Sequence, residues 1–124
     1  METTMKNYPK AFDEFLAGWN EWNADKRRGI FEQVVAPDVE FTDPLHRLSG
    51  IEAFLDMVTD FQRSRPGAVT LRTSDVDFHH HVARYHWAIM IDGVKLIDGF
   101  DAVQLDEQGR FQRICGFFGL LLQK

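Results

Sequence analysis

One segment constrains the fold more than any other: Gly99 to Leu122, with the sequence GFDAVQLDEQGRFQRICGFFGLLL. It predicts two long strands joined by the turn DEQG, in which Gly109 supplies the positive φ that tight hairpin turns often need. Both faces of the second strand are apolar, so we expect both to be buried. One face would cover the domain's own core or cavity. The other needs a cover, most simply a second copy of the chain.

Two carboxylates fall on apolar strand faces. Alternation along the first of these strands places Asp101 on the same face as Val103 and Leu105. The short segment VEFTDP also alternates, and it places Asp43 on an apolar face at a strand end that Pro44 stops. These two aspartates are the main candidates for chemistry in the chain.

Three segments upstream have the apolar spacing of a buried helical face. The first covers residues 8–23, and the second is shorter and ends at Pro37. A loop with the sequence DPLHRLSG then leads into the third helix, where Ser49 and Glu52 form a plausible capping box.

The rest of the chain predicts a meander of four strands. These strands are Val69 to Phe78 with a bulge near Asp75, Val82 to Ile91, Val94 to Leu105 after an Asp92-Gly93 turn, and Phe111 to Leu122. The order of elements is typical of an α+β fold. To bury 11 Phe and 3 Trp, the strands must curl around the helices. We therefore predict one domain over residues 1–124, with a cone-shaped, mixed or antiparallel sheet wrapped on three N-terminal helices around a pocket.

Composition argues against several classes of partner. The net charge is −5 and no basic stripe is present, so we do not expect nucleic acid binding. The longest apolar run, Ile114 to Leu122, is too short to span a membrane, and METTMKNYPK contains no apolar signal core. A single cysteine favours a reducing compartment. We expect a cytoplasmic protein.

Four stretches together resemble one known family. They are WNAD, VVAPDVEFTDP, the SG before the third helix, and GFDAVQLDEQGRFQRICGFFG. The chain resembles the nuclear transport factor 2-like superfamily, specifically its ketosteroid isomerase-like and SnoaL-like polyketide cyclase branch. The resemblance implies the same cone, a cystatin-like roll that is usually a homodimer through the outer sheet face. It leaves the activity open, because this fold hosts isomerases, cyclases, dehydratases and non-enzymes.

The resemblance also implies roles for two residues. The aspartate that moves the proton in ketosteroid isomerase matches Asp43, before Pro44, and the protonated aspartate that hydrogen-bonds the enolate oxygen matches Asp101. The tyrosine of that site falls here at Gly18 or Trp19. SnoaL-like cyclases look more similar, since they rely mainly on the acid at the Asp101 position.

The predicted chemistry is cofactor-independent acid–base catalysis on a small, apolar carbonyl compound. Desolvation in an apolar cavity would keep one carboxyl neutral while the other is ionised. Other readings stay open: Asp43 as a plain turn residue, Asp101 paired with an arginine or histidine, or a ligand-binding or dimerisation module without chemistry. Epoxide hydrolysis would need an arginine beside Asp101, such as an inward-facing Arg84.

The aromatic and histidine residues supply further candidates. We expect the pocket to be lined by Trp19, Phe54, Tyr85, Trp87, Ile114 and Phe118. His46 follows the D-P turn, and two placements stay open for it: at the cavity mouth, or exposed to solvent as is more usual for a loop histidine. His86 is expected on the outer face, unless a bulge reverses the strand's phase and makes it a base. The run from His79 to His81 falls at a strand end where side chains diverge, so we expect no metal site.

Overall fold

The computed structural model describes residues 8–121, which form three helices and a seven-stranded sheet. The helices are α2 (Tyr8–Asn20), α3 (Ala24–Val34) and α4 (Ile51–Ser64). The strands are β1 (Val35–Asp43), β2 (His46–Ser49), β3 (Val69–Arg72), β4 (Asp77–His79), β5 (Val82–Ile91), β6 (Val94–Leu105) and β7 (Phe111–Phe118). The predicted α+β class is confirmed.

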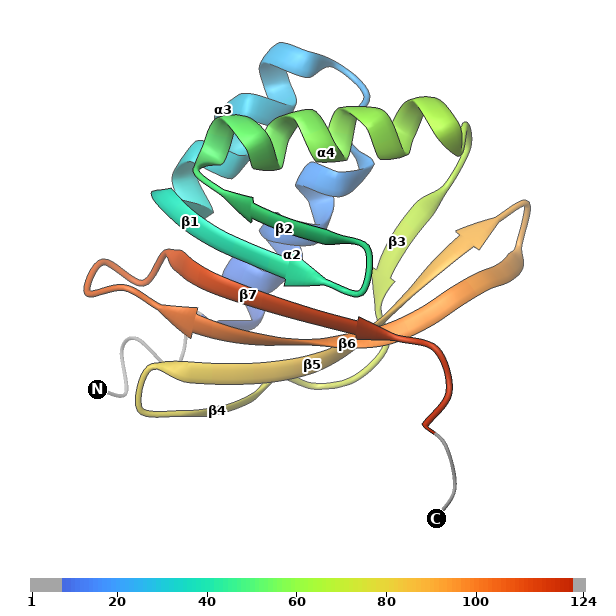
Figure 1. The fold of residues 1–124 in the computed structure, drawn as a ribbon. Coiled ribbons are helices and arrows are strands. Elements are labelled where there is room, and N and C mark those ends of the chain that lie inside the picture. Colours follow the sequence, from blue (N-terminus) through green and yellow to red (C-terminus); the bar gives the residue numbers. More distant parts are fainter. Residues whose placement is uncertain (1–7, 122–124) are drawn as a thin grey trace.

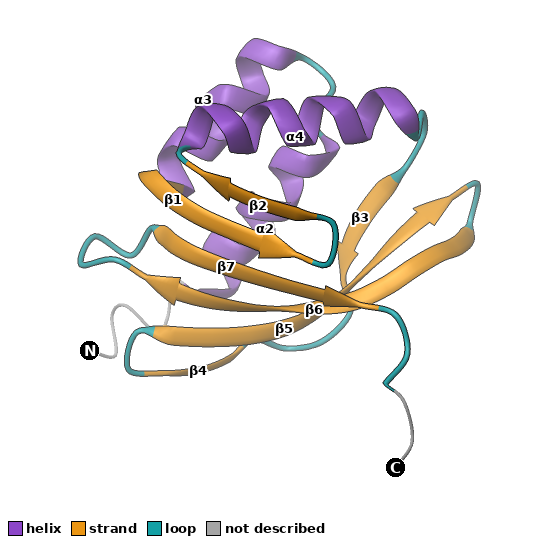
Figure 2. Cartoon of the chain, viewed as in Figure 1, coloured by secondary structure: helices purple, strands orange, loops and turns teal. Residues whose placement is uncertain are grey.

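The sheet is mixed and strongly curved. Its strand order is β2-β1-β7-β6-β5-β3, and β4 also pairs with β5. The β1–β7 pair is parallel, whereas the other pairs are antiparallel. Figure 1 shows the sheet curving beneath the helices, and Figure 2 shows that all three helices lie on the same face. The curled, mixed sheet was predicted, and the structure adds that the sheet does not close on itself.

Phenylalanine rings fill the space where helices meet sheet. Phe15 of α2 lies 5.6 Å from Phe31 of α3, 5.9 Å from Phe54 of α4 and 4.6 Å from Phe111 of β7, measured between ring centroids. All four rings are fully or almost fully buried. This cluster joins every helix to the sheet, and Phe15 also forms part of the wall of a cavity.

The first half of the chain corrects several predicted boundaries. The first helix ends at Asn20 instead of residue 23, and strand β1 begins at Val35, so Pro37 lies inside a strand and does not end a helix. Pro37 is tolerated because the β1–β7 register shifts between Val35 and Glu40, where no regular ladder needs its missing N–H.

The predicted loop DPLHRLSG is mostly a strand. Residues 46–49 form β2 and fold back antiparallel on β1, with Asp43 opposite His46. The capping box is also wrong, because Gly50 occupies the N-cap of α4 with φ 88° and no side chain caps that helix. The positive φ at this position favours glycine.

The second half departs from prediction at two places. The strand expected over residues 69–78 is two short strands, β3 and β4, which both pair with β5. Between them the Oγ of Ser74 accepts a hydrogen bond from the His86 N–H, at 2.8 Å, in place of a ladder bond. Strand β7 ends at Phe118, and Leu122 lies outside the described residues.

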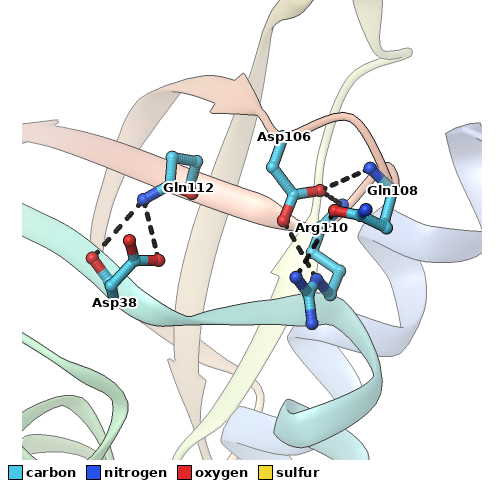
Figure 3. Close-up of polar contacts among 5 residues, drawn as sticks. All are labelled: Asp38, Asp106, Gln108, Arg110 and Gln112. Carbon is cyan, nitrogen blue, oxygen red and sulfur yellow. Dashed lines mark hydrogen bonds and ion pairs between the residues drawn. The ribbon is translucent and has the colours of Figure 1, made fainter.

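The predicted DEQG turn is present and is held by Asp106 (Figure 3). Its carboxylate accepts hydrogen bonds from the backbone N–H of Gln108 at 2.9 Å and of Arg110 at 2.8 Å, and from Arg110 Nε at 3.0 Å. Gly109 has φ 80°, as the turn requires. Next to the turn, Gln112 Nε2 donates to Asp38 Oδ1 at 3.1 Å, which ties β7 to β1.

Candidate active site

A cavity of about 840 Å³ lies between helices α2 and α4 and the inner face of the sheet. Its walls come from both helices, from the β1–β2 hairpin and from strands β3, β5, β6 and β7. The lining is mainly apolar, and the volume lies within the range of small-molecule sites. The predicted pocket therefore exists.

Asp101 is buried in the cavity wall, with 7% of its surface exposed. Its Oδ2 accepts a hydrogen bond from the Tyr85 hydroxyl at 2.6 Å, and its Oδ1 accepts one from Trp87 Nε1 at 3.0 Å. Burial raises the pKa of Asp101 to about 6; the two hydrogen bonds oppose this rise, and the charge of Asp43 adds to it. The partners of Asp101 are thus neutral donors, and not the arginine or histidine of the alternative reading.

Tyr85 serves as a fixed donor beneath that carboxyl. It lies directly opposite Asp101 in the β5–β6 register. Burial, together with the charge of Asp101 and the hydrogen bond to it, raises the pKa of Tyr85 well above its ordinary value. Tyr85 therefore stays neutral and orients Asp101 without giving up its own proton to that carboxylate.

Asp43 lies close to Asp101 because residue 116 has no side chain. A Cβ placed on Gly116 would lie 3.1 Å from Asp101 Oδ1 and 3.4 Å from the Asp43 Cβ. The separation between Asp101 Oδ1 and the Asp43 Cβ is therefore at most the sum of these two distances. Both aspartates line the cavity, and the Asp43 side chain is 14% exposed. The structure brings together the two carboxyls that the sequence singled out.

Comparison with known proteins identifies the fold. Neither a family model nor a curated protein matches the chain. A solved candidate isomerase of the SnoaL-like family from Agrobacterium tumefaciens has 26% identity and a TM-score of 0.87, covering 93% of this chain and 99% of its own. The chain has the fold of the SnoaL-like proteins in the nuclear transport factor 2-like superfamily.

Two further structures agree on the fold at lower identity. A candidate polyketide cyclase from Sinorhizobium meliloti has 14% identity and a TM-score of 0.68, with 87% of this chain and 94% of that chain covered. A SnoaL-like protein of unknown function from Burkholderia thailandensis has 12% identity and a TM-score of 0.73, with 97% and 98% covered. The resemblance inferred from the sequence motifs is confirmed.

Around the two acids, some of the predicted pocket residues lie in the cavity wall. Trp19, Trp87 and Phe118 line the cavity, and so does His46 at its mouth. Of the two positions that match the family's tyrosine, Trp19 lines the cavity, whereas a side chain at Gly18 would collide with the Phe31 ring.

Three predicted pocket residues do not line the cavity. Phe54 and Ile114 are fully buried in the core, and Tyr85 is 2% exposed behind Asp101. Phe54 and Ile114 belong to the hydrophobic core, and the rings of Phe15, Phe31 and Phe41 pack around Phe54. Facing inward is thus not sufficient to reach the cavity.

The remaining histidines and Arg84 lie outside the site. His86 is exposed on the outer face, with its ring 6.0 Å from that of Phe100. Among residues 8–121, no cluster of His, Cys, Asp or Glu could hold a metal ion. Arg84 is exposed and bonded to Asp77 at 2.8 Å, so it does not supply the arginine that epoxide hydrolysis needs beside Asp101.

The sequence reading missed polar residues on the far wall. Asp56 and Asp60, one turn apart on α4, line the cavity with Arg65 just beyond that helix. Their i, i+4 spacing next to the apolar stripe of α4 was the available signal. Thr70 of β3 also lines the cavity, and its buried hydroxyl has no hydrogen-bond partner among the described residues.

Within the described residues, no helix has the length and apolarity to cross a membrane.

Proposed function

We propose that this protein is a cofactor-independent acid–base enzyme of the isomerase, cyclase or dehydratase type, acting on a small, apolar carbonyl compound. One observation carries the proposal. Asp101 is a buried carboxyl with a pKa raised to about 6, in the wall of an apolar cavity and close to a second carboxyl. When the environments of two neighbouring titratable groups push their pKa values apart, the group with the raised pKa is usually the acid and the other is the base.

The proposed step is proton transfer next to a carbonyl. A base at the end of β1, where Asp43 lies, removes a proton from the carbon beside the carbonyl. The C–H electron pair becomes the C=C bond of an enolate, and the negative charge develops on the carbonyl oxygen. Protonated Asp101 donates a hydrogen bond to that oxygen, while Tyr85 and Trp87 hold its carboxyl in place. Returning the proton to another carbon completes an isomerisation.

The charges around the cavity support a neutral substrate. Four aspartates line it, and three of them, Asp43, Asp56 and Asp60, are available as carboxylates beside the acid Asp101, against one arginine and one histidine. An acid or a phosphate ester would meet like charges in a largely apolar space. We therefore expect the substrate to carry no negative charge.

Deuterium exchange tests the proposed function without knowledge of the natural substrate. Neutral apolar ketones are incubated with the protein in D₂O, and loss of the α-proton signal is followed by NMR. We expect catalysed exchange for at least one ketone, and a loss of about 100-fold in Asp101→Asn. Equal exchange rates in the wild type and the variant would remove Asp101 from the chemistry.

Tryptophan fluorescence separates binding from catalysis. Trp19 and Trp87 line the cavity, whereas Trp22 is 50% exposed elsewhere, so Trp22→Phe removes the background signal. Ketone-dependent quenching with no exchange in any ketone would favour the non-catalytic binding module instead.

We also propose a homodimer through the outer sheet face. Phe117 is 50% exposed there, and its ring stacks on Phe100 with centroids 4.9 Å apart. Exposed Leu71 and Val82 extend this apolar face across β3 and β5. We expect sedimentation to give a dimer at micromolar concentration and Phe117→Glu to give a monomer. A wild-type protein that sediments only as a monomer would contradict the proposal.

A further inference from the structure

The β1–β2 hairpin holds two candidate bases, the Asp43 carboxylate at the end of β1 and the His46 imidazole at the start of β2. Building on the proposed function, we propose that His46 Nε2 takes the proton from the substrate, and that Asp43 is a positioning residue that fixes the imidazole. The family resemblance assigns the proton to the aspartate itself. The local geometry of the β1–β2 hairpin favours the histidine.

A single oxygen of Asp43 organises the hairpin turn. Asp43 Oδ1 accepts a hydrogen bond from the Leu45 backbone N–H at 2.8 Å, and it lies 2.9 Å from His46 Nδ1. A backbone N–H is always a donor, so Oδ1 is an acceptor in the first contact. The same oxygen then accepts from Nδ1–H in the second, as a carboxylate oxygen with two lone pairs can. Both contacts hold Asp43 and His46 in one arrangement.

This arrangement selects the histidine tautomer. With its proton on Nδ1, a neutral imidazole carries its lone pair on Nε2. Nε2 has no hydrogen-bond partner among residues 8–121, although His46 lines the cavity. The result is an unprotonated nitrogen at the cavity mouth, backed by a carboxylate that stabilises the imidazolium formed when it takes a proton.

Exposure also favours His46 as the group that meets the substrate. Its side chain is 38% exposed, against 14% for Asp43. The cross-strand pairing of Asp43 with His46 places both side chains on one side of the hairpin, with the imidazole on the first residue of β2. Because Oδ2 of Asp43 has no partner among the described residues, direct catalysis by the carboxylate is the rival that an experiment must exclude.

A simple proton-abstraction probe distinguishes the two bases. 5-Nitrobenzisoxazole is neutral and apolar, and it opens when a base removes its C3 proton. The C–H electron pair forms the C≡N bond of the nitrile, the N–O bond breaks, and its electron pair stays on the oxygen, so the ring opens to a single coloured cyanophenolate. We expect His46→Gln to lower the catalysed rate at least 100-fold. Asp43→Asn should lower kcat about 10-fold to 100-fold with KM unchanged. The outer-face control His86→Gln should match the wild type.

Nitrogen NMR of the imidazole supplies a readout that a structural role would not change. We expect the proton of neutral His46 on Nδ1 in the wild type, and a shift toward Nε2–H in Asp43→Asn, whose amide can donate to Nδ1. Near-normal turnover in His46→Gln with none in Asp43→Asn would overturn the proposal, as would a wild-type proton on Nε2. No ring opening by the wild type would also overturn it, whereas the role of Asp101 is judged separately by deuterium exchange.

Discussion

Replacing Asp101 by asparagine should change how stability depends on pH, in a direction set by burial. The pKa of Asp101 is about 6 in the folded protein, against 3.8 for an unperturbed aspartate. Between these values the folded state binds more protons than the unfolded state, so the free energy of unfolding falls as pH rises. The ionised form of Asp101 therefore destabilises the fold at neutral pH. Asparagine cannot ionise and escapes this penalty.

The magnitude follows from the size of the shift. A rise of roughly 2 pKa units corresponds to about 3 kcal/mol over the whole titration, and about 2 kcal/mol of it falls between pH 4.5 and pH 8. The amide oxygen still accepts from Trp87, but the Tyr85 hydroxyl loses its acceptor, at a cost of about 1 kcal/mol. That cost is the same at every pH, so the pH dependence of the difference isolates the ionisation of Asp101.

The assay is urea unfolding of both proteins at several pH values between 4.5 and 8. We expect the stability of Asp101→Asn, relative to the wild type, to rise by about 2 kcal/mol across this range. Asp106→Asn is the matched control. Burial alone would raise the pKa of Asp106, but hydrogen bonds from Arg110 and Gln108 outweigh it and lower that pKa, so this variant should show no such rise. A flat difference for Asp101→Asn would refute the argument from burial.

Three other substitutions test the packing around the site. Gly116→Ala places a methyl group 3.1 Å from Asp101 Oδ1, so we expect it to lower catalysed ketone exchange at least 10-fold while the circular dichroism spectrum is kept. Gly99→Ala would collide with the Phe117 carbonyl and crowd the Trp87 ring, so thermal melting should show a loss of 2 kcal/mol or more, by order of magnitude. Arg27 is 4% exposed and donates hydrogen bonds to Gln62, Thr59 and the Glu21 carbonyl. We expect Arg27→Ala to lower the free energy of unfolding in urea by about 3 kcal/mol. A decrease smaller than about 0.5 kcal/mol would contradict this expectation.

Periodicity predicted the long strands of the sheet with their observed bounds. Strands β5 and β6 begin and end where alternation and the Asp92-Gly93 turn place them, because a run of alternating residues between strong turn signals leaves few choices. The same reasoning put Asp101 on the inner face. Predicted boundaries were wrong where contacts with distant parts of the chain decided them. Pro37 lies inside β1 because the β1–β7 pairing is irregular there. Strand β2 forms because it pairs with the free edge of β1.

The partners of Asp101 depend on a feature that alternation alone does not reveal. At the turn, Ile91 pairs with Val94. Counting outward from this pair one residue at a time on each strand would pair Tyr85 with Phe100. The register shifts by one between Ile89 and Met90, because Leu96 is an extra residue on β6, and Tyr85 then lies opposite Asp101. Without this bulge the alternation of β6 would be reversed relative to β5, and Phe100 would face the tyrosine. One added residue in the hairpin therefore decides which side chain pairs with Tyr85 in the cavity wall. We expect a variant that lacks Leu96 to lose the Tyr85–Asp101 hydrogen bond. The same variant should lose any activity that needs a neutral acid at that place.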